Sequence, residues 1–250
     1  MDIGKLERYV MENGISIVIP VYNEANNIAK TIEQIEQKIH TSREIIVIYD
    51  HDHDSTVPVV QEIISSGLIK SPIKLVKNNY GSGALYAIKT GFLYAQRKSI
   101  LVVMADLADD LGCVDTMVNL LKDTCAVVCG SRYMRGGKQI GGPFIKSLMT
   151  RIAGLSLYMF TKIGTHDVTN SFKLYDTAVL RSLTIESSGG FELGMEITVK
   201  AFLVGYTITE VPTIWKARKD GVSRFKLVAW LPHYMRWYLL ALFKGNRLVR

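Results

Sequence analysis

The chain is organised around the stretch Ser99-Ile-Leu-Val-Val-Met-Ala-Asp-Leu-Ala-Asp-Asp110, in which an apolar run is followed by three acids. The apolar run predicts a buried strand, whose carboxyl end delivers Asp106, Asp109 and Asp110. In α/β proteins ligands bind at this edge of the sheet, and carboxylate oxygens are ligands that Mg²⁺ prefers. A similar strand-then-acid pattern occurs at residues 45–54. Together the two patterns indicate an enzyme that acts on a nucleotide-type substrate.

Strands and helices are expected to alternate through the first half of the chain. The apolar, β-branched runs that predict strands lie at residues 15–20, 44–49, 73–77, 99–104 and 125–130. The helices expected between them lie at about residues 28–39, 57–66, 82–97 and 114–122, and Asn26 or Asn27 is expected to cap the first. This alternation predicts an α/β fold with a Rossmann-like, mainly parallel sheet flanked by helices.

The second half of the chain is less regular. Helices are expected at residues 144–162, 193–204 and 227–243, and strands at 172–175 and 206–211. The simplest division is a catalytic domain over residues 1–226 and a C-terminal amphipathic helix within residues 227–250. That helix is rich in Trp and Tyr, which is typical of a helix in a membrane interface; docking on the core is the alternative. No segment reaches the roughly 18 apolar residues of a membrane span.

Composition narrows the class of partner. With 48% hydrophobic and 21% charged residues, the chain of 250 residues is an ordered globular protein with a substantial core. Its formal charge of +7 favours anionic partners such as sugar nucleotides, lipid phosphates or an anionic membrane surface. Nucleic acid is not expected, because the basic residues are dispersed and no recognised module occurs. Cys113, Cys125 and Cys129 form no disulfide framework, and residues 1–13 are no signal peptide, so we expect a cytoplasmic setting.

Motifs near the first strands resemble those of a known enzyme family. The run Ile17-Val-Ile-Pro-Val-Tyr-Asn-Glu24 resembles the opening motif of family 2 glycosyltransferases, which have the GT-A fold. Residues 44–56 resemble the second motif, although Tyr49 replaces its first acid, and residues 77–84 resemble a glycine-rich element. The resemblance implies a nucleotide-sugar site formed by Pro20, Tyr22, Asn23, Glu24, Asp50, Asn79, Gly81, Gly83, Ala105 and Asp106.

The acids after the central strand resemble the Asp-x-Asp region of the same family. Asp106 stands at the position of the second acid, whereas the first acid is missing, because Met104 or a one-residue deletion stands there. The resemblance implies Mg²⁺ or Mn²⁺ held by Asp106, with Asp109 and Asp110 one turn later as further ligands. Such an ion would lower the charge on a departing diphosphate.

Motifs in the second half follow the family pattern in order. Residues 130–133, 167–173, 191–200 and 218–226 each resemble a family motif, so the resemblance covers about residues 15–226. It implies catalytic roles for Asp106, Arg132 and Arg218. It also implies that the acceptor phosphate is held by Arg132, Lys173, Arg218, Arg224 and Lys226. The basic loop at residues 218–226 is expected to order over bound nucleotide.

Within the family, the chain is most similar to the polyprenyl-phosphate glycosyltransferases, which include the dolichol-phosphate mannose synthases. This implies inverting transfer of a sugar from GDP-mannose or a UDP-sugar to dolichyl or undecaprenyl phosphate. The enzyme would be bound peripherally to the cytoplasmic face of a membrane. A phosphate acceptor is already ionised near neutral pH, so the reaction needs no strong general base.

Two other functions stay open on the sequence. Transfer to a saccharide hydroxyl would need a general base, for which Asp109, Asp110 and Glu196 are candidates. The second is a catalytically impaired subunit that binds a nucleotide-sugar within a membrane complex, because acids are missing at Tyr49 and Met104. A membrane-embedded partner subunit is also a candidate means of attachment for the active enzyme.

Overall fold

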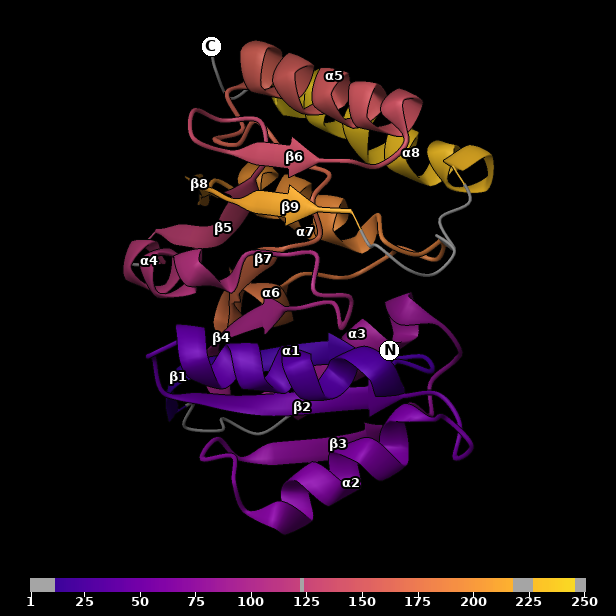
Figure 1. The fold of residues 1–250 in the computed structure, drawn as a ribbon. Helices are drawn as coiled ribbons and strands as arrows, with labels where there is room; N and C mark the ends of the chain where they lie inside the picture. The colour runs from indigo at the N-terminus through magenta and orange to yellow at the C-terminus, as the bar shows by residue number, and fades with distance from the viewer. Residues whose placement is uncertain (1–11, 122–123, 218–226, 246–250) are drawn as a thin grey trace.

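The computed structural model describes residues 12–121, 124–217 and 227–245 of the chain (Figure 1). The basic loop at residues 218–226 lies outside the described residues. The expected roles of Arg218, Arg224 and Lys226 therefore stay predictions.

Within the described residues, a seven-stranded sheet has the order β3-β2-β1-β4-β7-β5-β8. Its strands are β1 (Glu12–Pro20), β2 (Arg43–Tyr49), β3 (Ile73–Lys77), β4 (Arg97–Val102), β5 (Cys125–Ser131), β7 (Lys173–Asp176) and β8 (Thr207–Pro212). Strand β7 pairs antiparallel with both β4 and β5, and the other pairs run parallel. The prediction of an α/β fold with a mainly parallel sheet is confirmed.

Helices cover both faces of this sheet (Figure 1). Helices α1 (Ala25–Lys38), α2 (Thr56–Ser66) and α4 (Val114–Leu120) pack on one face, and α3 (Ala84–Tyr94), α6 (Thr177–Ser182) and α7 (Leu193–Leu203) pack on the other. In β2, Ile45 and Val47 enter the first core, whereas Ile46 and Ile48 enter the second. All four are fully buried, which explains why this strand reads as a continuous apolar run.

An outer layer is formed by α5 (Phe144–Thr161) and α8 (Leu227–Gly245), which lie side by side at one end of the molecule (Figure 1). A third apolar cluster joins them to α7, and it includes Leu157, Met195, Trp237 and Ala241. The C-terminal helix therefore docks on the core through one face. A short parallel pair, β6 (Lys138–Ile140) and β9 (Ile214–Lys216), lies beside this layer.

The structure corrects several predicted boundaries. Helix α3 ends at Tyr94, because the chain is extended at Ala95 and Arg97 already pairs with β1. Helix α1 begins one residue after Glu24, so neither Asn26 nor Asn27 is its cap. Strands β6 and β9 were not predicted, since each has only three residues. The expected helix at residues 227–243 is present and continues through Pro232.

Candidate functional site

The polar segments singled out in the sequence follow neighbouring strands. Residues 22–24 follow β1, residues 50–54 follow β2, residues 78–83 follow β3 and residues 105–110 follow β4. These strands are adjacent in the sheet and parallel, so their carboxyl ends meet at one edge. The structure therefore brings the expected nucleotide-sugar residues and the expected metal ligands to the same edge.

Asp54 fixes the loop that follows β1. Its buried carboxylate accepts hydrogen bonds from the backbone N–H of Asn23, at 3.1 Å to each oxygen, and from that of Thr56, at 2.8 Å. The Thr56 hydroxyl in turn accepts a bond from the Glu24 N–H, at 2.9 Å. Asn23 has a left-handed backbone (φ 56°), a conformation that asparagine tolerates well. These hydrogen bonds connect the loops that follow β1 and β2, and they fix the positions of Asn23 and Glu24.

Tyr22 is exposed beside this loop, whereas Pro20 is buried at the end of β1. Proline 20 is the last residue of β1, opposite Ile48 of β2. The Tyr22 side chain is 43% exposed, and its ring lies edge-on to that of His51 at a centroid distance of 5.4 Å. An exposed aromatic ring at the carboxyl edge of a parallel sheet can stack on a flat ligand such as a nucleobase.

The Asn78 side chain connects several parts of the loop that follows β3 through hydrogen bonds. Its amide nitrogen donates to Asp50, at 2.9 Å, and to the carbonyl of Gly81, at 2.7 Å. Its amide oxygen accepts from the Thr90 hydroxyl, at 2.9 Å. The second oxygen of Asp50 accepts from the Gly83 N–H at 2.7 Å, just before α3. Sequence reasoning missed Asn78, although an Asn directly after β3, beside the Asp50 that follows β2, is the signal that would have found it.

The predicted binding residues of this loop lie at its surface. Asn79, Gly81 and Gly83 are all exposed. Gly83 has φ +95°, which glycine adopts without strain, and a Cβ on Gly81 would lie 2.7 Å from the Tyr86 ring. The glycines thus allow the backbone to turn tightly at the N-terminus of α3, where backbone N–H groups favour anionic ligands.

Asp106 and Asp109 form a pair of half-buried carboxylates after β4. Burial and the nearby negative charge of Asp106 raise the pKa of Asp109 to about 7. Asp106 also accepts a hydrogen bond from the N–H of Ala108 at 3.1 Å, and the preceding Ala105 is buried. Two crowded oxygen donors of like charge suit a divalent cation, which would relieve their repulsion.

Asp110 is directed elsewhere. Its carboxylate accepts a hydrogen bond from the N–H of Gly112 at 3.1 Å, inside a single 3₁₀ turn, and lies 4.0 Å from the Lys38 ammonium of α1. Among the residues that the structure describes, no group of three or more His, Cys, Asp or Glu side chains could hold a metal ion. Asp106 and Asp109 are thus the carboxylates that could hold Mg²⁺ or Mn²⁺, and metal binding by them or by Asp110 stays a prediction.

Arg132, directly after β5, is held by Asp167. Its Nε and Nη2 atoms donate to the two carboxylate oxygens at 2.7 and 2.8 Å, and its backbone N–H donates at 3.0 Å. Asp167 is fully buried, and this pairing outweighs burial and raises the pKa of Arg132. The charges of Arg132 and Asp109 also act on each other. The structure thus places a fixed guanidinium beside the carboxylate pair.

Lys173 is fully buried beneath the loop that carries Asp167. Its ammonium donates to the carbonyl oxygens of Val168, at 2.8 Å, and Asn170, and burial lowers its pKa. In this arrangement Lys173 supports the loop from below, and its contact with an acceptor phosphate stays a prediction. It is the one predicted phosphate-binding residue among the described positions that faces the interior.

Glu196, a candidate base for a hydroxyl acceptor, is also fully engaged. Its buried carboxylate accepts from the N–H groups of Glu186 and Ser187, at 2.6 and 2.8 Å. The Lys200 ammonium lies 2.7 Å from the same carboxylate. These contacts tie α7 to the segment before it.

Comparisons with known sequences show the family of this chain. Residues 16–184 match the family described as "Glycosyl transferase family 2". The chain is 27% identical to a dolichol-phosphate mannosyltransferase of Pyrococcus furiosus, over 85% of this chain and 59% of that protein. It is 24% identical to a polyprenol monophosphomannose synthase of Mycolicibacterium smegmatis, over 83% of this chain and 79% of that protein. The chain thus spans about three fifths of the length of the first relative.

Solved structures share the fold. Crystal structures of glucosyl-3-phosphoglycerate synthase from Mycobacterium tuberculosis match with TM-scores of 0.65 and 0.64 at 18% identity, covering 98% of this chain and 84% of theirs. The first holds Mn²⁺, UDP and glucosyl-3-phosphoglycerate, and the second holds Mg²⁺ and UDP. The fold is that of GT-A glycosyltransferases. Because the family match covers most of the sheet and its strand-end loops, the chain belongs to glycosyl transferase family 2.

Proposed function

We propose that this protein transfers a sugar, with inversion, from a nucleotide-sugar such as GDP-mannose or a UDP-sugar to a polyprenyl phosphate. The observation that carries the proposal is the pair Asp106 and Asp109 beside the Arg132 guanidinium, at the edge where the nucleotide-binding loops meet. Similarity to a dolichol-phosphate mannosyltransferase and a polyprenol monophosphomannose synthase supports the polyprenyl acceptor and a mannosyl donor.

Asp106 and Asp109 would hold Mg²⁺ or Mn²⁺, which when bound supplies positive charge against a departing diphosphate. Arg132 adds a guanidinium whose orientation is set by Asp167, so little reorganisation is needed when an anionic group arrives. Asp50 uses its two oxygens on Asn78 and Gly83, yet a carboxylate has about four lone-pair sites and retains capacity for a donor group of the base.

Of the three candidate bases for a saccharide hydroxyl, Glu196 is engaged by other groups, and Asp109, whose pKa is raised to about 7, is assigned in this proposal to the metal ion. A hydroxyl must lose its proton to a base, whereas Glu196 is saturated by two backbone N–H groups and the Lys200 ammonium. An ionised phosphate needs positive charge and alignment instead, which Arg132 offers.

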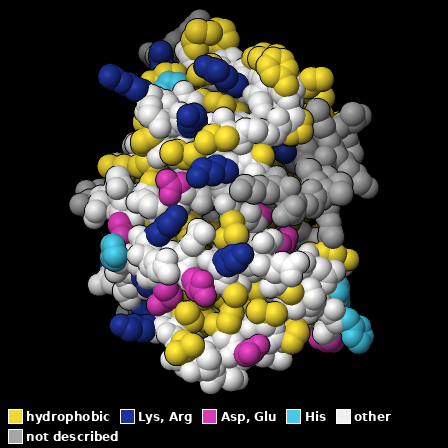
Figure 2. Space-filling model, in the orientation of Figure 1, with side chains coloured by type: hydrophobic (Ala, Val, Ile, Leu, Met, Phe, Trp, Pro, Cys, Tyr) yellow, Lys and Arg dark blue, Asp and Glu magenta, His cyan; other side chains and the backbone are white. Residues whose placement is uncertain are grey.

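The outer layer supports peripheral attachment to the cytoplasmic face of a membrane. Seven apolar residues of α5 are exposed along that helix: Phe144, Ile145, Leu148, Ile152, Leu155, Met159 and Phe160. Helix α8 adds Leu231, Met235, Leu239 and Phe243, and we call the combined surface the α5–α8 face. Apolar side chains gather at this end of the molecule (Figure 2). No helix among the described residues is both long and apolar enough to cross a bilayer.

An exposed apolar face of this extent is typical of interfacial helices, whose binding strength grows with the buried apolar area. The division of the chain at residue 226 stays a prediction. A membrane-embedded partner subunit would compete with lipid for the same face.

The test is a transfer assay with purified protein, labelled GDP-mannose or UDP-sugars, Mn²⁺ and a polyprenyl phosphate. Labelled glycolipid is expected, and Asp106→Asn should remove most of it. Glu62→Gln, which changes an exposed carboxylate on α2, is the matched control and should leave the rate unchanged. Absence of glycolipid across the donor panel would exclude the lipid acceptor, and transfer to an added saccharide would favour the hydroxyl-acceptor function.

A further inference from the structure

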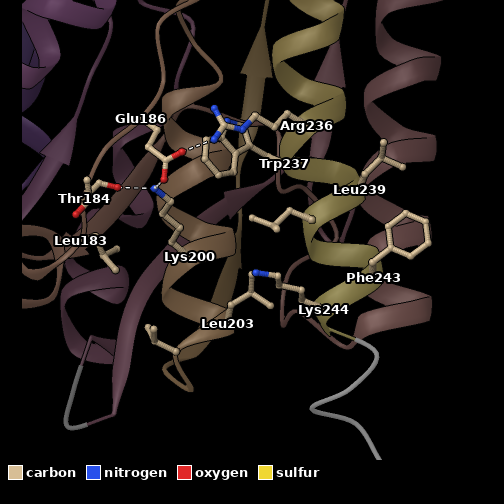
Figure 3. Close-up of a pocket in the computed structure, with 12 residues that line it drawn as sticks. Leu183, Thr184, Glu186, Lys200, Leu203, Arg236, Trp237, Leu239, Phe243 and Lys244 are labelled. Carbon is tan, nitrogen blue, oxygen red and sulfur yellow. Dashed lines mark hydrogen bonds and ion pairs between the residues drawn. The ribbon is translucent and has the colours of Figure 1, made fainter.

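A groove lies away from the sheet edge, between α7, α8 and the segment at residues 183–186 (Figure 3). It is open to solvent and has a volume of about 700 Å³. Its apolar lining comes from Leu183, Leu203, Val204, Trp237, Leu239, Leu240 and Phe243. This volume falls within the range of small-molecule sites, which are typically about 300–1,000 Å³.

The charged residues of the groove are mainly basic. Lys200, Arg236 and Lys244 line it together with a single acid, Glu186. Lys200 lies 2.9 Å from Glu186, and Arg236 pairs with the same carboxylate (Figure 3). Glu186 is thus shared by two cations, and hydrogen bonding by Lys200 lowers its pKa. Lys200 also lies 2.7 Å from Glu196, so both Lys200 and Arg236 have carboxylate partners. Among the described residues no acid pairs with Lys244, which leaves the groove with an excess of positive charge at that residue.

The groove is distinct from the site after the strands. Near the start of α7, a Cβ on Gly194 would lie 3.5 Å from the Lys173 ammonium, which supports the Asp167 loop. Leu203, in the groove, is the last residue of α7. At 1.5 Å per residue, the two positions are separated by roughly 13 Å along the helix. An acceptor phosphate bound beside Lys173 and Arg132 would therefore lie outside this groove.

The groove is continuous with the α5–α8 face. Leu239 and Phe243 line the groove and also belong to the α5–α8 face; they are 40% and 69% exposed. Val204, at the other wall, is 63% exposed. Because the face and the groove share these side chains, an acyl chain at the α5–α8 face can extend into the groove.

We propose that the groove binds one anionic membrane phospholipid, with its phosphate at Lys244 and Arg236 and an acyl chain along Leu203, Leu240 and Phe243. The apolar lining favours a hydrocarbon chain, and Lys244, which pairs with no acid among the described residues, favours a negative headgroup over a zwitterionic one. The inference rests on the membrane location in the proposed function, and deepens it by adding a second, non-reacting lipid site.

The test uses monomeric lipid, so that neither a bilayer nor a sugar nucleotide is needed. Dihexanoyl-phosphatidylglycerol is titrated into the full chain below its micellar concentration and binding is followed by calorimetry. One saturable site is expected. Dihexanoyl-phosphatidylcholine and inorganic phosphate are titrated in parallel, and both should bind at least several-fold more weakly. Equal binding of phosphatidylcholine would overturn the role of charge, and equal binding of phosphate would overturn the role of the chain.

Two variants locate the site. Lys244→Glu should weaken binding by roughly three- to tenfold, as expected for reversing one partly exposed charge. Val204→Trp should fill the groove and weaken binding without touching a charge. Lys98→Glu, an exposed charge reversal at the start of β4, is the matched control and should bind as the parent does. Absence of saturable binding, or binding unaffected by both groove variants, would overturn the proposal, whereas glycolipid formation in the transfer assay would stand independently.

Discussion

Arg132 donates three hydrogen bonds to Asp167, two from its guanidinium at 2.7 and 2.8 Å and one from its backbone N–H at 3.0 Å. The carboxylate is fully buried, and the arginine side chain is 10% exposed. This pair links the end of β5 to the loop before β7, so it sets both the loop and the direction of the positive charge at the candidate site.

Asp167→Asn should lower the free energy of unfolding by about 3–5 kcal/mol, because it leaves a largely buried guanidinium without its counter-charge. Urea unfolding at pH 7 measures the change. Transfer activity should fall as well, since Arg132 loses its orientation. Asp52→Asn, which breaks an exposed pair with Lys77, is the control and should change stability little. A stable Asp167→Asn protein with full activity would contradict the role assigned to the pair.

Single Asp→Asn substitutions should distinguish the proposed metal ligands, Asp106 and Asp109, from the neighbouring Asp110. Asp106→Asn and Asp109→Asn should each reduce the thermal shift that GDP or UDP produces in the presence of Mn²⁺. Asp110→Asn should retain most of that shift, because its carboxylate bonds Gly112 and faces Lys38. Differential scanning fluorimetry with and without Mn²⁺ makes the comparison. Loss of the shift in Asp110→Asn alone would show that the metal site is formed differently.

Asn78→Ala should destabilise the protein by about 1–3 kcal/mol, since it leaves buried partners of the amide unsatisfied. The KM for the nucleotide-sugar should rise, because Asp50 and the Gly81–Gly83 turn lose their common anchor. Asn79→Ala is the matched neighbour: it is exposed, so stability should stay within about 0.5 kcal/mol. Thermal unfolding and donor kinetics of both variants distinguish support of the loop from contact with the ligand.

The contribution of Glu44 to the free energy of unfolding should depend on pH in the acid range. Burial tends to raise its pKa, but bonds from Lys74 and Ser16 and from the N–H of Gln96 outweigh burial and hold the pKa below 4.5. Since the pKa is lower when folded, the stabilisation is present above about pH 4.5 and is lost as the pH falls through the folded value.

Glu44→Gln should therefore cost about 2 kcal/mol at pH 7 and progressively less below pH 4. Urea unfolding of both proteins between pH 7 and pH 3 tests this. A difference that stayed constant over the whole range would mean that charge at Glu44 is not the cause.

Charges placed on the α5–α8 face should prevent membrane binding. Phe144→Glu combined with Ile152→Glu removes two side chains that are 78% and 58% exposed, so folding should be unaffected. Co-sedimentation with vesicles containing phosphatidylglycerol should fall strongly. Leu68→Glu, at a site 83% exposed beyond α2, is the control and should sediment with vesicles like the parent. Binding by the double variant at the parent level would place the membrane contact elsewhere.

Local patterns predicted much of the fold. Strands β1, β2 and β4 each contain a buried apolar run that needs no distant information, and α1 shows its buried face through the spacing of Ile28, Ile32 and Ile35. The family recognition from the strand-end motifs is confirmed by the match over residues 16–184. The short strands β6 and β9 were not predicted, because three residues are too few to show a periodicity.

The chain's local sequence determined the longer strands and the polar segments that follow them, because the side-chain period is a local property and alternating strands and helices favour a parallel sheet. Only the tertiary structure decided that Asn78 rather than Asn79 is buried in the loop after β3, that Asp110 turns towards Lys38, and that Lys173 lies beneath its loop. These outcomes depend on partners far away in the chain. A polar side chain that is removed from water takes whichever partner the packing brings within reach, and no local pattern specifies that choice.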